Sequence, residues 1–257
     1  MGDGFMRRAF NQFIKGVTAC LALTTLTSCL PLAYAAKAVS HPVSPELNRT
    51  KMAYLTFDDG PSENTERILA ILRKYGIRAT FFVIGNSSDE GKRLYRRIHA
   101  DGHVIGNHTY SHNYQVVYSS VQAFAKDTER LETLLEQTIG VRPALLRYPG
   151  GSNNLVSLHY GGKQIMPRII HEMTRKGYDY IDWNVSSTDA ARTVQPKREI
   201  IDAVLSASRT KKEAVILMHD VKVKTTTVEA LPEIIEGLVK QGFHFDVLSR
   251  ASFHYHF

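Results

Sequence analysis

Short runs of apolar residues alternate along the chain with longer segments in which apolar residues recur every three or four positions. The short runs are typical of buried strands, and the longer segments are typical of amphipathic helices. The first run, Met52 to Phe57, is followed by a helical pattern from Glu63 to Tyr75 that stops at Gly76. The same order repeats to the end of the chain. It predicts strands at 52–57, 79–84, 103–107, 143–146, 178–183, 214–218 and 243–248, and helices at 63–75, 88–100, 119–139, 165–176, 196–208 and 227–241.

Buried strands that alternate with helices indicate βα units and therefore a parallel sheet. About seven such units in one chain favour closure into a barrel, although the pattern alone leaves an open sheet as an alternative. We therefore predict the α/β class and, within it, a distorted (β/α) barrel of about seven parallel strands. In such barrels the reacting groups lie at the carboxyl ends of the strands. Those strand ends are where a functional site is expected.

The first 35 residues have the character of a targeting segment. Basic residues at positions 7, 8 and 15 precede an uncharged stretch from Gly16 to Ala35, which closes with Ala33-Tyr34-Ala35. That order is typical of a secretory signal peptide, so we predict cleavage near Ala35. A retained membrane anchor is the second choice, and a lipoprotein modified at Cys29, in Leu26-Thr27-Ser28-Cys29, is the third. All three place the rest of the chain outside the cytoplasmic membrane, either secreted or at the cell surface.

The remaining sequence divides into a linker at residues 36–50 and a domain at 51–257. Both cysteines, Cys20 and Cys29, precede that domain, which leaves His, Asp and Glu as its candidate catalytic and metal-binding side chains. The 257 residues are 43% hydrophobic, enough for a buried core, and carry a net charge of +7. The basic residues are scattered and do not alternate with aromatics, so we expect no nucleic-acid partner. A polyanionic surface such as a cell wall suits the charge.

Polar residues follow the predicted strands, beginning with the adjacent carboxylates Asp58 and Asp59, which repel unless a cation or a shared proton lies between them. The spacing of His108 and His112 would place both rings on one side of a helical turn. Two imidazoles and one carboxylate leave coordination positions for water and substrate, as hydrolytic zinc sites require. The alternative at this point is a solvated turn with surface histidines. Further polar groups at strand ends are Arg147-Tyr148-Pro149-Gly150-Gly151, Asp182, Asp189 and His219-Asp220.

These groups form five short motifs in a fixed order. The motifs are Thr56-Phe57-Asp58-Asp59-Gly60-Pro61, His108-Thr109-Tyr110-Ser111-His112, Arg147-Tyr148-Pro149-Gly150-Gly151, Asp182-Trp183-Asn184-Val185-Ser186-Ser187-Thr188-Asp189-Ala190 and Ile216-Leu217-Met218-His219-Asp220. The chain thereby resembles the polysaccharide deacetylase family with NodB homology, whose members are metal-dependent carbohydrate esterases. The resemblance extends from about Lys51 to Leu248, so it identifies residues 51–257 as a polysaccharide deacetylase catalytic domain.

The resemblance implies a role for each residue at the centre of the site. Asp59, His108 and His112 would bind the metal, usually zinc and in some members Co²⁺ or another divalent ion. Asp58 would be the general base that takes a proton from the attacking water. This division of the two acids is chemically reasonable, because a carboxylate that ligates a metal is committed to it while its neighbour can accept a proton. A backbone N–H near Tyr148 would complete the oxyanion site.

The resemblance also implies the partners of the base and a proton donor. Arg147 would pair with Asp58 and keep it ionised. His219 would be the general acid that delivers a proton to the leaving amine. Asp189 would orient and tune His219, and Asp182 is the alternative for that role because the sequence does not decide which carboxylate reaches the imidazole.

The chain departs from the family pattern at one position that bears on the substrate. Many members have Trp after the last Asp of the fourth motif, where it lines the acetyl pocket, whereas this chain has Ala190. The pocket wall would then come from Trp183 or Leu217, and Tyr148 and Pro149 are further candidate substrate-binding residues. The Ser-Ser-Thr-Asp-Ala ending resembles the branch of the family that acts on bacterial cell-wall glycan.

The resemblance therefore implies an exported polysaccharide N-deacetylase that removes acetyl groups from an amino-sugar polymer. Peptidoglycan N-acetylglucosamine is the first choice of substrate. Chitin oligosaccharides, a surface exopolysaccharide and acetylated xylan are alternatives. An inactive homologue that only binds glycan is an alternative of another class, and it is disfavoured because the predicted ligands, base and general acid are all present.

Overall fold

The structure is a computed structural model that describes residues 50–257. The predicted signal peptide or anchor at 1–35, the predicted linker up to residue 49, and both cysteines, Cys20 and Cys29, lie outside the described residues. The described residues belong to one compact unit, Leu47–Phe257. Among them, no helix is both long enough and apolar enough to cross a membrane.

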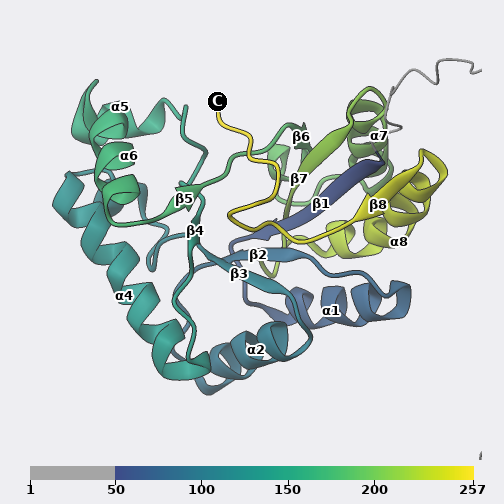
Figure 1. The fold of residues 1–257 in the computed structure, drawn as a ribbon, viewed down its shortest axis with the longest axis horizontal. Coiled ribbons are helices and arrows are strands. Elements are labelled where there is room, and N and C mark those ends of the chain that lie inside the picture. Colours follow the sequence, from purple (N-terminus) through teal and green to yellow (C-terminus); the bar gives the residue numbers. More distant parts are fainter. Residues whose placement is uncertain (1–49) are drawn as a thin grey trace, which may run out of the picture. The chain divides into compact units, whose positions relative to one another are not determined.

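An eight-stranded parallel sheet forms the centre of this unit. Its strands are β1 (Lys51–Asp58), β2 (Thr80–Val83), β3 (Val104–Asn107), β4 (Leu145–Leu146), β5 (Asp179–Tyr180), β6 (Val185–Ser186), β7 (Glu213–His219) and β8 (Phe243–Phe245). They follow one another in the order β5-β4-β3-β2-β1-β7-β6, and β8 pairs with the first residues of β1. The sheet is curled and helices surround its outer side (Figure 1). This architecture confirms the predicted distorted (β/α) barrel.

All six predicted helices are present. They are α1 (Glu63–Tyr75), α2 (Asp89–Ala100), α4 (Val121–Ile139), α6 (Ile165–Arg175), α7 (Lys197–Ser208) and α8 (Thr225–Lys240). Three shorter elements were not predicted, because one or two turns are too short to show a helical period. They are α3 (Tyr114–Val117), α5 (Val156–Gly161) and the 3₁₀ turn η1 (Asp189–Ala191).

The sheet differs from the prediction between β5 and β6. One strand was predicted over 178–183, but β5 ends at Tyr180 and the chain leaves the sheet before β6 begins. There the Asp182 N–H donates to the carbonyl oxygen of Tyr255 at 2.8 Å, so the C-terminal segment satisfies the backbone where a longer strand would have paired. An apolar run indicates that a segment is buried, but it does not identify the partner of its backbone groups.

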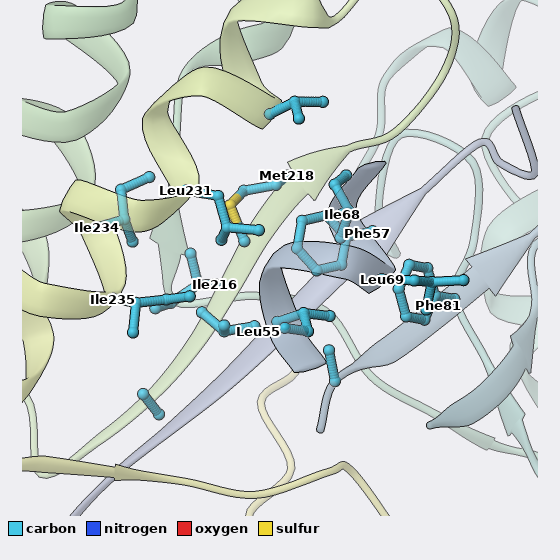
Figure 2. Close-up of a cluster of buried hydrophobic side chains, with 14 of the residues drawn as sticks. Leu55, Phe57, Ile68, Leu69, Phe81, Ile216, Met218, Leu231, Ile234 and Ile235 are labelled. Carbon is cyan, nitrogen blue, oxygen red and sulfur yellow. The ribbon is translucent and has the colours of Figure 1, made fainter. Parts of the chain in front are cut away.

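The two faces of β1 have different roles. Leu55 and Phe57 point outward and join Ile216 and side chains of α1 and α8 in a buried apolar cluster (Figure 2). Because side chains alternate along a strand, Thr56 and Asp58 point to the inner face. A slip of one residue would turn every side chain of β1 to the opposite face. Burial of the outer face therefore keeps Asp58 in the interior of the barrel.

The turn after β1 is stabilised by the start of α1. Ser62 is the N-cap, with its Oγ accepting from the Asn64 N–H at 3.1 Å and its own N–H donating to Thr65 Oγ1 at 2.8 Å. Thr65 Oγ1 in turn donates to the carboxylate of Asp220, which follows β7. Gly60 lies against this carboxylate, and a side chain there would collide with it. The ends of β1 and β7 are thus joined around the turn that carries the second aspartate.

Candidate active site

The three implied metal ligands, Asp59, His108 and His112, meet at the carboxyl end of the sheet. Asp59 Oδ1 lies 3.4 Å from His108 Nε2 and 3.2 Å from His112 Nε2, and the three ligand atoms lie within 4.8 Å of one another. This oxygen is buried and has no hydrogen-bond partner among the described residues. A buried polar atom without a partner is unfavourable. A divalent cation between the oxygen and the two nitrogens would satisfy it, so the donor set fits such an ion.

The loop that carries the two histidines is not the helical turn that the spacing predicted. Thr109 and His112 have φ values of 67° and 48°, which are left-handed and incompatible with an α-helix. Instead, Asn107 Oδ1 accepts from the Thr109 N–H at 2.9 Å, and Asp127 Oδ1 accepts from the Ser111 N–H at 2.8 Å. The two imidazole rings still lie 5.0 Å apart. Side chains from outside the motif, rather than a helical period, bring them together.

His108 and Asp59 are oriented as metal ligands. His108 Nδ1 lies 2.7 Å from the carbonyl oxygen of Arg147, so Nδ1 donates its hydrogen there and Nε2 is the ring nitrogen directed at Asp59. Burial alone would raise the pKa of Asp59, but the facing rings of His108 and His112 hold it well below its usual range. The site therefore presents an anionic oxygen beside the Nε2 atoms of both histidines.

Asp58 adjoins Asp59 but has different partners. Its Oδ1 accepts from Arg147 Nη1 at 2.9 Å, and its Oδ2 lies 3.8 Å from His108 Nε2. Arg147 is fully buried. It also donates to Thr56 Oγ1 at 2.7 Å and to two carbonyl oxygens of the segment between β5 and β6. The guanidinium thus occupies one oxygen of Asp58 with a charge-assisted hydrogen bond and leaves the other on the side of the metal ligands.

His219 ends β7 directly beside Asp58, its partner in the β1–β7 pair. Its Nδ1 lies 2.7 Å from Asp189 Oδ1, while its N–H and Thr227 Oγ1 donate to Asp189 Oδ2 at 2.8 and 2.9 Å. Burial alone would lower the pKa of His219, but Asp189 and then the charges of Asp58 and Asp59 raise it to about 9. At neutral pH His219 is therefore an imidazolium that can donate a proton.

Asp182, the alternative partner of His219, faces a different segment. Its carboxylate accepts from the N–H and the hydroxyl of Ser152 at 2.9 and 2.5 Å, and from the Phe257 N–H at 3.1 Å. These bonds attach the loop after Arg147 to the segment between β5 and β6. Asp189, rather than Asp182, is the carboxylate in contact with the imidazole.

The four candidate substrate-binding residues lie at different depths. Tyr148 is fully buried in an aromatic and aliphatic cluster, and Pro149 is buried beside it, so their part in substrate binding stays a prediction. The Tyr148 N–H donates to no other described residue, which leaves it available as an oxyanion donor. Leu217 is buried on the inner face of β7. Trp183 is half-buried, and its ring lies against Gly151.

Tyr114, which no sequence motif singled out, lies beside the metal ligands. Its ring meets that of His112 edge-on, with centroids 5.5 Å apart, and a Cβ at Gly150 would lie 2.8 Å from its hydroxyl. Burial and then the charges of the two adjacent aspartates raise the pKa of Tyr114 to about 12, so its hydroxyl stays protonated at neutral pH. Asn113, the N-cap of α3, was the sequence signal that could have located this residue.

Known proteins resemble this chain in sequence and fold. The family profile "Polysaccharide deacetylase" matches residues 47–164. The peptidoglycan-N-acetylglucosamine deacetylase of Bacillus cereus is 32% identical over 206 residues, 79% of this chain and 71% of that protein. The chitin deacetylase of Colletotrichum lindemuthianum is 29% identical over 89% of this chain and 90% of its own. The catalytic domain of the peptidoglycan N-acetylglucosamine deacetylase of Eubacterium rectale superposes with a TM-score of 0.76 at 34% identity, covering 86% of this chain and 97% of that domain.

Fold, site and similarities together define a hydrolase built on a distorted (β/α) barrel. The chain belongs to the polysaccharide deacetylase family. It is accordingly a carbohydrate esterase that hydrolyses acetyl amides on a polysaccharide. Members of this family are generally metal-dependent, and the group formed by Asp59, His108 and His112 fits that property.

Proposed function

We propose that this chain is a metal-dependent N-deacetylase that acts outside the cytoplasmic membrane on the N-acetylglucosamine residues of peptidoglycan. One observation carries the chemistry: the buried Oδ1 of Asp59 lacks a hydrogen-bond partner and faces two imidazoles, next to the carboxylate of Asp58, which is held by Arg147. Asp59 and the two imidazoles suit a divalent cation, and Asp58 is a base beside them.

Asp59, His108 and His112 would hold the ion. Two nitrogen donors and one oxygen donor suit zinc, and they also accept Co²⁺ or another divalent ion. When bound, the cation would polarise the acetyl carbonyl and lower the pKa of the attacking water. Three protein ligands leave room for both reactants, which is typical of a catalytic rather than a structural site.

Asp58 removes the proton from the attacking water. Its Oδ2 lies on the side of the metal ligands, while Oδ1 is occupied by Arg147. The fixed guanidinium holds the carboxylate in place and prevents its rotation away from the water. As the carbonyl carbon becomes tetrahedral, its oxygen gains negative charge, which the Tyr148 N–H would stabilise.

His219 completes the reaction by protonating the leaving nitrogen. The C–N bond breaks, acetate leaves, and the amine stays on the sugar. The hydrogen bond between Nδ1 and Asp189 Oδ1 fixes the orientation of the ring and favours its charged form. The proton therefore leaves from Nε2, the ring nitrogen on the side away from Asp189.

Replacing Asp189 with asparagine should move the alkaline limb of the pH–rate profile to lower pH. His219 must be protonated to act, so the wild-type rate declines as the pH rises through about 9, the raised pKa of His219. Without the negative charge of Asp189 the pKa of His219 falls, and the limb moves by about 1–3 pH units. The check is kcat against pH with the same metal in both enzymes. Asp182→Asn should leave the limb in place, and an unmoved limb in Asp189→Asn contradicts the assignment.

Three observations support peptidoglycan as the polymer. The deacetylases of Bacillus cereus and Eubacterium rectale described above are named for peptidoglycan. The net charge of +7 favours an anionic wall. Ala190 is exposed and small where many family members have Trp, which agrees with the cell-wall branch. The apolar N-terminal segment supports export, with the chain secreted or attached to the membrane. Chitin is the second candidate, because the chitin deacetylase of Colletotrichum lindemuthianum matches almost end to end.

The test of this assignment is acetate release from peptidoglycan, chitin oligosaccharides and acetylated xylan by the full chain. Asp58→Asn at the same concentration corrects for contaminating esterases. The proposal predicts the highest kcat/KM on peptidoglycan. A higher value on chitin or xylan would move the substrate to that polymer, and no acetate from any of them by metal-loaded protein would contradict the proposal.

A further inference from the structure

Lys224 is a buried lysine to which neither the family resemblance nor the proposed mechanism assigns a role. It is 8% exposed and lies directly before α8, at its N-cap position. Its ammonium donates to the carbonyl oxygens of Asp189, Arg192 and Thr193 at 2.8, 2.7 and 3.1 Å. An ammonium has three N–H donors, so all of them are directed to backbone carbonyls. Lysine is rarely buried in this way, because desolvating a charge is unfavourable.

The three carbonyls belong to the turn that presents Asp189 to the active site. Asp189 begins η1, and Arg192 and Thr193 follow its end. Carbonyls of a single short turn have few partners within it, so a cation that donates to them stabilises the turn. Thr188, just before the turn, has a φ of 59°, a left-handed conformation that needs support from its surroundings. The ammonium gathers these carbonyls around one point and so determines the path of the turn.

The same turn connects Lys224 to the Asp189 carboxylate. The carboxylate is held from the other side by His219 and by Thr227 of α8. Lys224 and Thr227 both lie at the start of α8, one contacting the backbone of Asp189 and the other its side chain. A shift of the backbone would therefore move the carboxylate relative to the imidazole, which is fixed on β7.

We propose that Lys224 is a positioning residue for the proton donor, acting through Asp189 on His219. The inference rests on the proposed role of His219 as general acid. Lys222 offers an internal contrast, because its side chain is 73% exposed and, among residues 50–257, pairs only with Glu63, at 3.1 Å. The two lysines belong to one loop and have the same charge. Lys224 contacts the turn of Asp189, whereas Lys222 lies at the surface.

The test compares Lys224→Met with Lys222→Met in the full chain. Methionine keeps the length of the side chain but has no donors, so the carbonyls lose their partner. For folded, metal-loaded Lys224→Met we expect kcat to fall about 10–100-fold, the range seen when an outer partner of an active-site group is removed, with KM and bound metal near wild type. Lys222→Met should stay within about twofold of wild type, because surface substitutions of this kind have small effects.

Two further readouts separate positioning from a loss of stability. The alkaline limb of the pH–rate profile should move to lower pH in Lys224→Met, and the low-field proton resonance of the His219 Nδ1–H should shift or broaden. Neither change follows from a smaller folded fraction. If Lys224→Met does not fold, Lys224→Gln takes its place. Its amide has two N–H donors for three carbonyls, so kcat should fall and the alkaline limb should move in the same directions, by less than expected for Lys224→Met.

Wild-type kcat and an unmoved pH limb in folded Lys224→Met or Lys224→Gln would overturn the inference. His219→Ala, measured in parallel, separates this result from a failure of the proposed function. A slow His219→Ala beside a normal Lys224→Met removes only the positioning role. A His219→Ala variant with wild-type kcat would remove the general acid itself and the positioning role with it.

Discussion

The Asp58→Asn variant should keep its metal and lose turnover by about 10²–10⁴-fold, the usual contribution of a general base. Asparagine has nearly the size of aspartate and can still accept a hydrogen bond from Arg147, but it cannot take a proton from water. The ligands Asp59, His108 and His112 remain, so metal binding persists. The fully buried Arg147 loses its anionic partner, and removal of one member of a buried pair can cost about 3–5 kcal/mol of stability.

The measurement is therefore kcat per folded, metal-loaded molecule, with the metal content determined on the same sample. Asp59→Asn is the matched control, because it makes the same chemical change at the next residue. It should lose the metal as well as the activity. Two adjacent substitutions with opposite effects on metal content would separate the base from the ligand. Wild-type turnover in Asp58→Asn would exclude Asp58 as the base.

His112→Ala should lose both metal and activity. The site retains one imidazole and one carboxylate, which are too few protein ligands for a catalytic zinc site. Loss of a residue that only hydrogen-bonds a metal ligand lowers metal affinity by about 10–100-fold. Loss of the ligand His112 itself should lower the affinity further. Equilibrium dialysis against zinc, followed by metal analysis, measures this directly.

His244→Ala is the control for His112→Ala, because His244 is an exposed histidine on β8 with no part in the site. It should bind one ion per chain with wild-type affinity. Stoichiometric, tightly held metal in His112→Ala would mean that another residue completes the ligand set.

The fold class could be predicted because apolar residues recur with different periods in strands and in helices. The location of the site could be predicted because the carboxyl ends of parallel strands lie at one edge of the sheet. Asp59, His108 and His219 follow or end different strands, far apart in the sequence, and the topology alone brings their strand ends together. The five ordered motifs then indicated the family, which the comparisons confirm.

The course of the loops could not be predicted, because residues distant in the sequence determine it. The loop of His108 and His112 depends on Asp127, which lies within α4. The choice between Asp182 and Asp189 as partner of His219 depended on where the chain leaves the sheet after β5. Whether a lysine is at the surface or beneath a turn likewise depends on the tertiary packing of both segments.

The central claim is that this chain deacetylates a glycan with a divalent cation held by Asp59, His108 and His112. Acetate release from peptidoglycan or chitin oligosaccharides by chelator-treated full chain, titrated with zinc or Co²⁺, tests it most directly. The account predicts no acetate before metal is added and full activity at one ion per chain. Undiminished release of acetate by metal-free protein would contradict it.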